Sequence, residues 1–200
     1  MSLIIFLRHG EAKNNVERIL AGRTDGFPLT QTGLEQAKKI ASFLKPLAIS
    51  AIYSSPIERA LTTATIVAKN LNLDCRVDAR LTEIDMGSFS GMEYEKMFAK
   101  YGNVFLKFYQ DSNIILENGV ESFSNVKKRV LEMVEHCSKE HNSKNVLLVT
   151  HMDPIKAMIS TILPLKSESL YELIIRNASI TIIKNEQGNY SLAAINSMNA

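Results

Sequence analysis

Arg8 and His9, near the start of the chain, are residue types that bind anions or attack phosphorus. They come directly after the apolar run Leu3–Leu7, in the stretch FLRHGEAKNN. Arginine offers planar, bidentate donors that match phosphate oxygens, and a neutral histidine can act as a nucleophile. This order of residues indicates an anionic ligand at the end of a strand. Gly10 is expected to let the backbone turn closely past that ligand.

Arg59 is the second candidate cation, and its expected position in a helix is unusual. The sequence Ser55-Pro56 predicts a helix start, with Ser55 as N-cap and Pro56 at the first helical position. Arg59 would then lie in the first turn, where the helix dipole disfavours a positive charge. A cation at this place is favourable if an anion binds beside it, so the position indicates an anion site.

His151 and Glu83 follow two further expected strands, at 145–150 and 75–78. The carboxyl ends of parallel strands open on one edge of a sheet, where ligands bind, so we expect these residues to converge with the three above. A phosphoryl group would neutralise the two arginines. One histidine could attack phosphorus while the other donates to its oxygens. A carboxylic acid could protonate the leaving oxygen, and Glu83 is the candidate.

Strands and helices are expected to alternate along the chain. Continuous apolar runs predict strands that are covered on both faces, and apolar residues at helical spacing predict helices between them. The fold class is therefore α/β, a three-layer α/β/α sandwich with a mostly parallel central sheet, in a single domain over 1–200. The expected strands are 3–7, 49–53, 75–78, 145–150, 179–184 and 190–195, and the expected helices are 34–44, 60–71 and 123–137.

Residues 84–118 interrupt this alternation and are expected to form a small helical cap insertion over one end of the sheet. They hold seven of the fourteen aromatic residues, and two interpretations stay open. The aromatic side chains could pack the cap onto its base, or they could contact an apolar or ring-bearing alcohol.

Composition limits the partners of this 200-residue chain. A formal charge of +2 does not favour nucleic acid or a membrane surface. Cys75 and Cys137 lack the spacing of a zinc site, and no secretory leader or membrane span is expected, so we expect a cytoplasmic protein.

His136 and His141 would lie about 140° apart on a helix and are expected to be surface residues that share no metal. The sequence leaves the oligomeric state open, with a homodimer as one possibility.

The ordered motifs resemble the histidine phosphatase superfamily, also called the phosphoglycerate mutase-like family. Its signature LRHGE is intact at Leu7–Glu11. The resemblance covers most of the chain and rests on PLTQTGLEQA (28–37), IYSSPIERALTTA (52–64), RLTEIDMGSFSG (80–91), NGVESFSNVKKRV (118–130) and VLLVTH (146–151).

The resemblance implies a role for each residue of the site, with no metal and no cofactor. His9 would be the phosphorylated nucleophile and Glu83 the proton donor. The phosphate pocket would consist of Arg8, Arg59 and His151, assisted by Asn15, with the loop Gly22–Thr24 near the substrate. Two departures affect substrate identity: Met152 stands where many members have glycine and narrows the pocket, and Val120 interrupts a Gly-Gly-Glu-Ser pattern.

Among four candidate functions, the sequence favours the phosphatase branch of the family. It is supported by TEIDMGSFSG and by the short segment 196–200 after the last expected strand. The alternative is a cofactor-dependent mutase of the phosphoglycerate type, which must exclude water while its intermediate reorients. A metal-dependent hydrolase using His9, Glu11, His151 and Asp153 is disfavoured, because nearby arginines would repel the metal. The complete residue set disfavours a binding protein with an inactive pocket. The expected substrate is a phosphorylated small molecule, with phosphoprotein left open.

Overall fold

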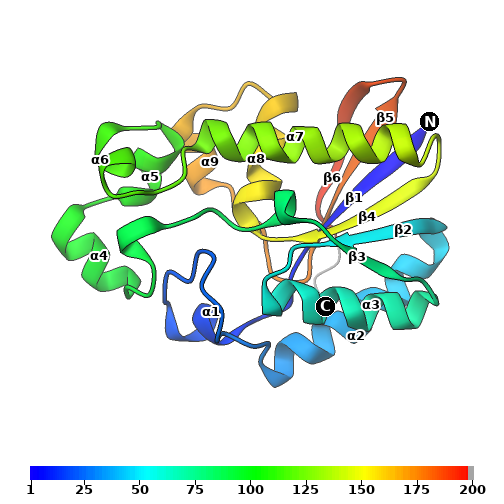
Figure 1. Ribbon diagram of the computed structural model, residues 1–200, viewed down its shortest axis with the longest axis horizontal. Helices are drawn as coiled ribbons and strands as arrows, with labels where there is room; N and C mark the ends of the chain where they lie inside the picture. The colour runs from blue at the N-terminus through cyan, green and yellow to red at the C-terminus, as the bar shows by residue number, and fades with distance from the viewer. Residues whose placement is uncertain (198–200) are drawn as a thin grey trace.

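A six-stranded sheet lies between two layers of helices in the computed structural model, which describes residues 1–197 (Figure 1). The strand order is β3-β2-β4-β1-β5-β6. Strands β3, β2, β4 and β1 are parallel, β5 pairs antiparallel with β1, and β6 pairs antiparallel with β5. The predicted α/β fold with a mostly parallel sheet is confirmed. The strands are β1 (Ser2–Arg8), β2 (Ile49–Ser54), β3 (Cys75–Val77), β4 (Asn145–Thr150), β5 (Ile180–Glu186) and β6 (Asn189–Ser197).

Two pairs of long helices cover the two faces of the sheet (Figure 1). One face carries α2 (Gln31–Leu44) and α3 (Glu58–Leu71), and the other carries α7 (Phe123–Glu140) and α8 (Met152–Ile162). The shorter elements are α1 (Lys13–Glu17), α9 (Ser167–Glu172) and the 3-10 turns η1 (Lys45–Leu47) and η2 (Ala79–Leu81). None of the described helices is both long and apolar enough to span a lipid bilayer.

The alternation of side chains along β1 explains why its apolar run is continuous. Ile4 and Phe6 belong to the core cluster under α7 and α8, whereas Ile5 and Leu7 belong to the cluster under α2 and α3. All four side chains are buried, because helices cover both faces of the strand. The polar residues that follow β1 are therefore anchored by packing on both sides of the sheet.

The predicted helix start at Ser55-Pro56 is wrong by two residues. The helix α3 begins at Glu58, and Ile57 occupies the N-cap position without a side-chain cap. Ser55 instead continues the sheet, because its backbone N–H donates to the Val149 carbonyl oxygen at 3.0 Å. Its hydroxyl accepts from the Ile57 N–H at 3.2 Å, which makes a local turn before the helix.

The segment predicted as a cap holds η3 (Gly87–Phe89) and three short helices, α4 (Tyr94–Tyr101), α5 (Val104–Tyr109) and α6 (Asn113–Glu117), beyond one end of the sheet (Figure 1). Most of its aromatic rings pack against one another. Phe89 and Phe108 are also buried in the core cluster under α7 and α8. Tyr94 and Phe105 contact each other and also line a cavity. The end of the predicted domain, 198–200, lies outside the described residues.

Candidate active site

The strand order brings together residues that are far apart in the sequence. Because β1, β4 and β2 are neighbours, their carboxyl ends lie side by side. Arg8 stands opposite Thr150 in the parallel register, and the His9 N–H donates to the Thr150 carbonyl oxygen at 3.0 Å. His151 follows Thr150 directly. The two histidine rings therefore meet edge to face, with centroids 5.1 Å apart.

A cavity of about 50 Å³ opens at this edge of the sheet. Its walls come from the ends of β1 and β4, the start of α3, the loop before η3 and the cap. Seven of the residues singled out in the sequence line it, namely Arg8, His9, Asn15, Gly22, Arg59, Glu83 and Met152. His151 lies directly behind His9 and is completely buried. The structure thus places every predicted site residue at one point.

His9 is held as a neutral imidazole with one nitrogen available to an electrophile. Its side chain is 2% exposed, and its Nδ1 donates to the Gly10 carbonyl oxygen at 2.7 Å. The other nitrogen, Nε2, accepts from the Arg59 Nε–H at 3.3 Å. Burial, together with the positive charges of Arg59 and Arg8, lowers the pKa of His9 well below its ordinary value. Nε2 therefore carries a lone pair at neutral pH.

His151 has the opposite arrangement of its two nitrogens. The Ser55 hydroxyl lies 2.8 Å from Nε2 and accepts from the Ile57 N–H. Its proton has no other acceptor among the described residues, so we assign it as the donor to Nε2 of the imidazole. The remaining Nδ1–H is buried and has no partner among the residues that the structure describes. Burial and the charge of Arg59 lower the pKa of His151 well below its ordinary value. His151 thus offers a neutral N–H donor.

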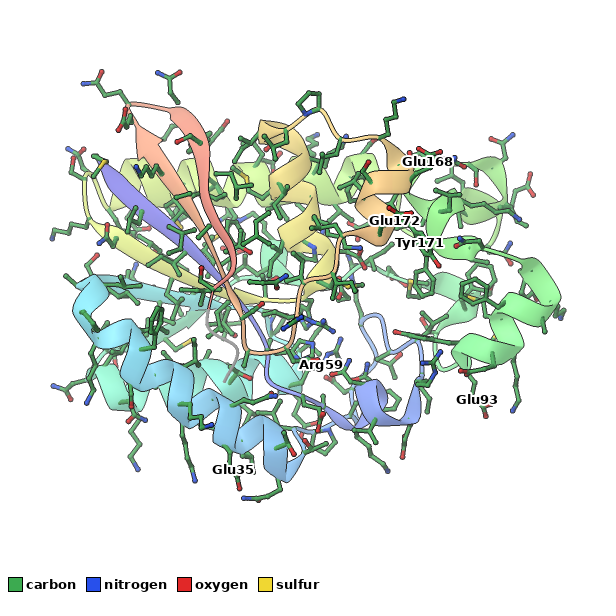
Figure 2. The ribbon with its side chains drawn as sticks, turned by 180° about the vertical axis from the view of Figure 1, so that it is seen from behind. Glu35, Arg59, Glu93, Glu168, Tyr171 and Glu172 are labelled. Carbon is green, nitrogen blue, oxygen red and sulfur yellow. The ribbon has the colours of Figure 1, made fainter. Side chains whose placement is uncertain are left out.

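The backbone of the loop 22–24 orients Arg59, which Figure 2 shows near the centre of the molecule. Nη2 donates to the Gly22 carbonyl oxygen at 2.7 Å, and Nη1 lies 3.5 Å from that of Thr24. Gly22 has φ +50°, and a Cβ there would come within 2.9 Å of the Met86 side chain. Only glycine fits this turn without strain, so Gly22 acts on the site through Arg59.

Arg8, the last residue of β1, also lines the cavity and is partly buried. Its Nη1 donates to the Ile175 carbonyl oxygen, while its Nε has no partner among the described residues. Burial lowers the pKa of Arg8, although the charges of Glu83 and Asp153 act in the other direction. Two guanidinium groups beside two neutral imidazoles make a site for an anion with several oxygens.

Glu83 is the carboxyl group at the cavity wall, and its proton is held unusually tightly. Burial and the negative charge of Asp153 raise the pKa of Glu83 to about 7, against opposing effects from Arg59 and Arg8. Oε1 accepts from the backbone N–H of Ile84 at 3.0 Å and from that of Asp153 at 3.3 Å. Oε2 has no hydrogen-bond partner within residues 1–197, so it is the oxygen that can carry a proton into the cavity.

A partly buried ion pair fixes the backbone that carries Glu83. Arg129 makes two hydrogen bonds with the Glu121 carboxylate, at 2.9 and 3.0 Å. The same guanidinium group donates to the carbonyl oxygens of Arg80, Thr82 and Glu83, at 2.8, 2.6 and 3.2 Å. Glu121 belongs to the segment in which Val120 interrupts the Gly-Gly-Glu-Ser pattern of the family. Its carboxylate makes a structural contact with Arg129 despite that change.

Gly10 is required for a close approach, but to a helix and not to the cavity. A Cβ on Gly10 would come within 2.5 Å of the Gly33 carbonyl oxygen, and one on Gly33 within 2.0 Å of that of Glu11. A close backbone contact with the first turn of α2 therefore explains why position 10 needs glycine. This contact holds the loop after β1 in place. That Gly10 also turns past a ligand stays a prediction.

Asn177 and Tyr94 belong to the site and were not assigned to it from the sequence. The Asn177 amide donates to the His9 carbonyl oxygen at 3.2 Å and to Asn15 Oδ1 at 3.2 Å, and it thereby ties the two together. Tyr94 lines the cavity, as does Asp153, which the sequence placed only in the metal-dependent alternative. No local sequence pattern marks Asn177 or Tyr94.

The metal-hydrolase alternative is not supported by the side-chain positions. The Glu11 carboxylate accepts from the Thr30 hydroxyl at 2.7 Å, at the start of α2, and does not line the cavity. No group of three or more His, Cys, Asp and Glu residues within residues 1–197 is arranged to hold a metal.

The prediction that His136 and His141 are both surface residues is wrong for His141. Because α7 ends at Glu140, the helical angle does not apply to His141. Its partly buried ring and the exposed ring of His136 both lie edge-on to Tyr53, with centroids 5.7 and 6.2 Å away.

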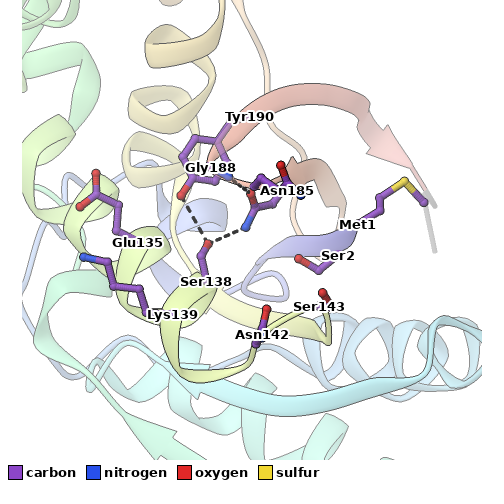
Figure 3. A pocket seen from close by; sticks show the side chains of 11 residues that line it. Met1, Ser2, Glu135, Ser138, Lys139, Asn142, Ser143, Asn185, Gly188 and Tyr190 are labelled. Carbon is purple, nitrogen blue, oxygen red and sulfur yellow. Dashed lines mark hydrogen bonds between the residues drawn. The ribbon is translucent and has the colours of Figure 1, made fainter.

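A larger cavity, of about 600 Å³, lies at the opposite end of the sheet (Figure 3). Ser138 joins Asn185 and Tyr190 there by hydrogen bonds of 2.9 and 3.3 Å. Its walls mix polar groups of both charges, and it holds none of the predicted site residues. Its size alone therefore does not make it the functional site.

The chain belongs to the histidine phosphatase superfamily (branch 1), whose family model matches residues 4–198. It is 37% identical over 188 residues to a 2,3-bisphosphoglycerate-dependent phosphoglycerate mutase from Thermoplasma acidophilum, with 94% of this chain and 90% of that protein covered. It is also 32% identical over 190 residues to phosphoserine phosphatase 1 from Hydrogenobacter thermophilus, with 94% and 88% covered.

A solved structure with the same fold is that of a mycobacterial glucosyl-3-phosphoglycerate phosphatase in complex with VO3. The TM-score is 0.87 at 27% sequence identity, and the superposition covers 98% of this chain and 99% of that one. Family membership and these relatives support an enzyme that acts on phosphate esters, in agreement with the resemblance found in the sequence.

Proposed function

We propose that the protein is a phosphatase that hydrolyses a phosphomonoester through a covalent phosphohistidine on His9. The observation that carries this proposal is the pair of adjacent neutral histidines, one with a lone-pair nitrogen and the other with an unpaired N–H donor. His9 presents a lone pair on Nε2, and His151 presents an unpaired N–H on Nδ1. A nucleophile and a donor at one anion site are what phosphoryl transfer to an enzyme requires.

The first half of the reaction transfers the phosphoryl group to the enzyme. Nε2 of His9 attacks phosphorus, and the bond between phosphorus and the alcohol oxygen breaks. Glu83 gives its proton from Oε2 to the departing oxygen, since its raised pKa keeps the carboxyl partly protonated near pH 7. The alcohol leaves with that proton, and Glu83 remains as a carboxylate.

The second half returns the enzyme to its starting state. A water molecule gives a proton to the Glu83 carboxylate and attacks the phosphorus of the phosphohistidine. The bond between phosphorus and Nε2 breaks, which restores neutral His9 and releases inorganic phosphate. No step in this sequence requires a metal or a cofactor.

The cations and donors of the site bind the phosphoryl oxygens throughout. Arg59 now donates to Nε2 of His9, and with a phosphoryl group bound the same N–H would turn to an oxygen. Arg8 and His151 each have an unpaired buried nitrogen for this purpose. Asn15 uses Oδ1 to accept from Ala12 at 3.0 Å, which leaves its amide N–H₂ to donate. A mycobacterial phosphatase with the same fold forms a complex with VO3, an oxyanion similar to phosphate, which supports phosphoryl binding by this chain.

A trapping experiment tests the covalent step. The protein is incubated with a panel of phosphorylated metabolites, quenched at alkaline pH, and examined by mass spectrometry for a phosphorylated His9 peptide. We expect labelling of the wild type and of His136→Ala, a histidine outside the site, and none of His9→Ala. Phosphate trapped on the His9→Ala protein would contradict the assignment of the nucleophile. Ranking the panel by kcat/KM identifies the alcohol.

A mutase of the phosphoglycerate type is the second candidate, because a relative at 37% identity carries that name. The two activities differ in where the phosphoryl group goes after His9. With 3-phosphoglycerate and a bisphosphoglycerate primer, a phosphatase releases inorganic phosphate. Rapid formation of 2-phosphoglycerate with little free phosphate would replace the phosphatase proposal by the mutase.

A further inference from the structure

Lys156 is a buried lysine beside the candidate active site that the proposed reaction does not use. It lies on α8 and is 2% exposed. Its Nζ donates to the Tyr109 hydroxyl at 3.0 Å and to the Leu170 carbonyl oxygen at 2.7 Å, and it lies 4.9 Å from the centre of the Tyr109 ring. Burial lowers the pKa of Lys156 to about 8. A buried cation is costly unless its partners compensate, so these contacts need an explanation.

The contacts form a chain whose direction is fixed at both ends. The Tyr109 hydroxyl lies 2.7 Å from Asp153 Oδ1. An ammonium group can only donate and a carboxylate can only accept. The hydroxyl therefore accepts from Lys156 and donates to Asp153. Through this chain, α5 of the cap holds one carboxylate oxygen of a residue that is itself 5% exposed.

The other end of the chain reaches Glu83. The Asp153 backbone N–H donates to Glu83 Oε1 at 3.3 Å, and both side chains line the same cavity. The negative charge of Asp153 acts on the Glu83 carboxyl group at this place and raises its pKa. Other charged and titratable groups also act on Glu83 from the surrounding elements: Arg8 on β1, Arg59 on α3, Tyr94 on α4, Tyr109 on α5 and Lys156 on α8. The Glu83 carbonyl oxygen in addition accepts from Arg23 and Arg129.

We propose that Asp153 is a positioning residue for Glu83, and that Tyr109 and Lys156 hold its carboxylate where it keeps the neighbouring Glu83 carboxyl protonated. The proposal rests on the proposed function, because it assigns the array to the proton donor of that reaction. It gives the buried lysine a purpose: its ammonium group holds the Tyr109 hydroxyl that binds Asp153, and its positive charge offsets part of the negative charge that acts on Glu83.

Two substitutions of opposite charge test the proposal through the pH profile of kcat/KM. Asp153→Asn keeps the shape and removes the negative charge, so Glu83 loses its proton more easily. The alkaline limb of the profile should move about 1 pH unit lower. Lys156→Met removes a positive charge, so the same limb should move higher. Asp74→Asn and Lys139→Met change charges at exposed positions away from the site and should leave the limb in place.

A titration that needs no turnover separates this proposal from the proposed function. In protein labelled with ¹³C at glutamate carboxyls, the Glu83 resonance should titrate at lower pH in Asp153→Asn than in the wild type. Asp153→Ser serves as a second variant if the first does not fold. An unchanged Glu83 titration, with kcat reduced equally at every pH, would overturn the proposal and make Asp153 a packing residue. A shifted titration in a protein that never labels His9 would instead overturn the proposed reaction.

The role of Tyr109 is tested by a double-mutant cycle. Tyr109→Phe keeps the ring packing and removes the hydroxyl that holds Asp153. If the hydroxyl acts through Asp153, this change should lower kcat in the wild type and have less effect in the Asp153→Asn background. Equal losses in both backgrounds would show that Tyr109 acts independently, contrary to the proposal.

Discussion

Replacing Glu83 by glutamine should stabilise the protein at alkaline pH, and by an amount that the structure predicts. Burial and Asp153 raise the pKa of this carboxyl from 4.5 to about 7. The folded protein therefore binds the proton more tightly than the unfolded chain does. This contribution to stability is complete below pH 4.5 and is lost as the pH rises through 7. The difference between the two pKa values corresponds to about 3 kcal/mol.

Glutamine has no charge at any pH and can still accept the N–H groups of Ile84 and Asp153 through its oxygen. The free energy of unfolding of Glu83→Gln, minus that of the wild type, should therefore rise by up to about 3 kcal/mol between pH 4 and pH 8. Taking the difference between the two free energies of unfolding removes the contributions of the other titratable groups, which both proteins share.

Urea unfolding followed by circular dichroism at several pH values measures this difference. Glu35→Gln, on the exposed surface of α2 in Figure 2, is the matched control and should show no such rise. If the free energies of unfolding of Glu83→Gln and the wild type differed by the same amount at every pH, the reasoning would be refuted. That result would mean that folding does not raise the free energy of the ionised Glu83 carboxylate.

Three further predictions concern catalysis and packing. Glu83→Gln should reduce kcat about 10²- to 10⁴-fold on alkyl phosphates and less on p-nitrophenyl phosphate, whose leaving group needs no proton; equal losses on both would argue against Glu83 as the acid. Gly33→Ala should destabilise the fold by about 1–3 kcal/mol in urea, because its Cβ would overlap the Glu11 carbonyl oxygen. Arg129→Met should cost about 1–3 kcal/mol, because the carbonyl oxygens of Arg80, Thr82 and Glu83 lose a donor. Glu121 keeps its ion pair with Arg23, and a change near zero would contradict the structural role of Arg129.

The sequence predicted most of the fold because the relevant signals are local. The continuous apolar runs correspond to β1, β2 and β4, and the helical spacing corresponds to α2, α3 and α7. The exceptions involve competition with distant partners. Ser55 has the residue type of an N-cap, but pairing with β4 keeps it in the sheet. His141 lies just past the end of α7, and packing on Tyr53 removes it from the surface.

The sequence by itself also determined the chemistry of the site. Arg8, His9, Arg59, Glu83 and His151 were found because each follows an apolar run or begins a helix, and such transitions are visible without a structure. Parallel strands then require their carboxyl ends to meet at one edge. The residue types and their place in the fold are thus properties of the chain.

The tertiary structure decided what each group can do. The contact with Ser55 leaves Nδ1 of His151 as the N–H donor, and the contact with Gly10 leaves the lone pair on Nε2 of His9. The chain from Lys156 to Asp153 could not be found from sequence spacing, since its Tyr109 link comes from the cap, 44 residues away. Protonation depends on burial and on charges brought close by folding, and these exist only once the layers have packed.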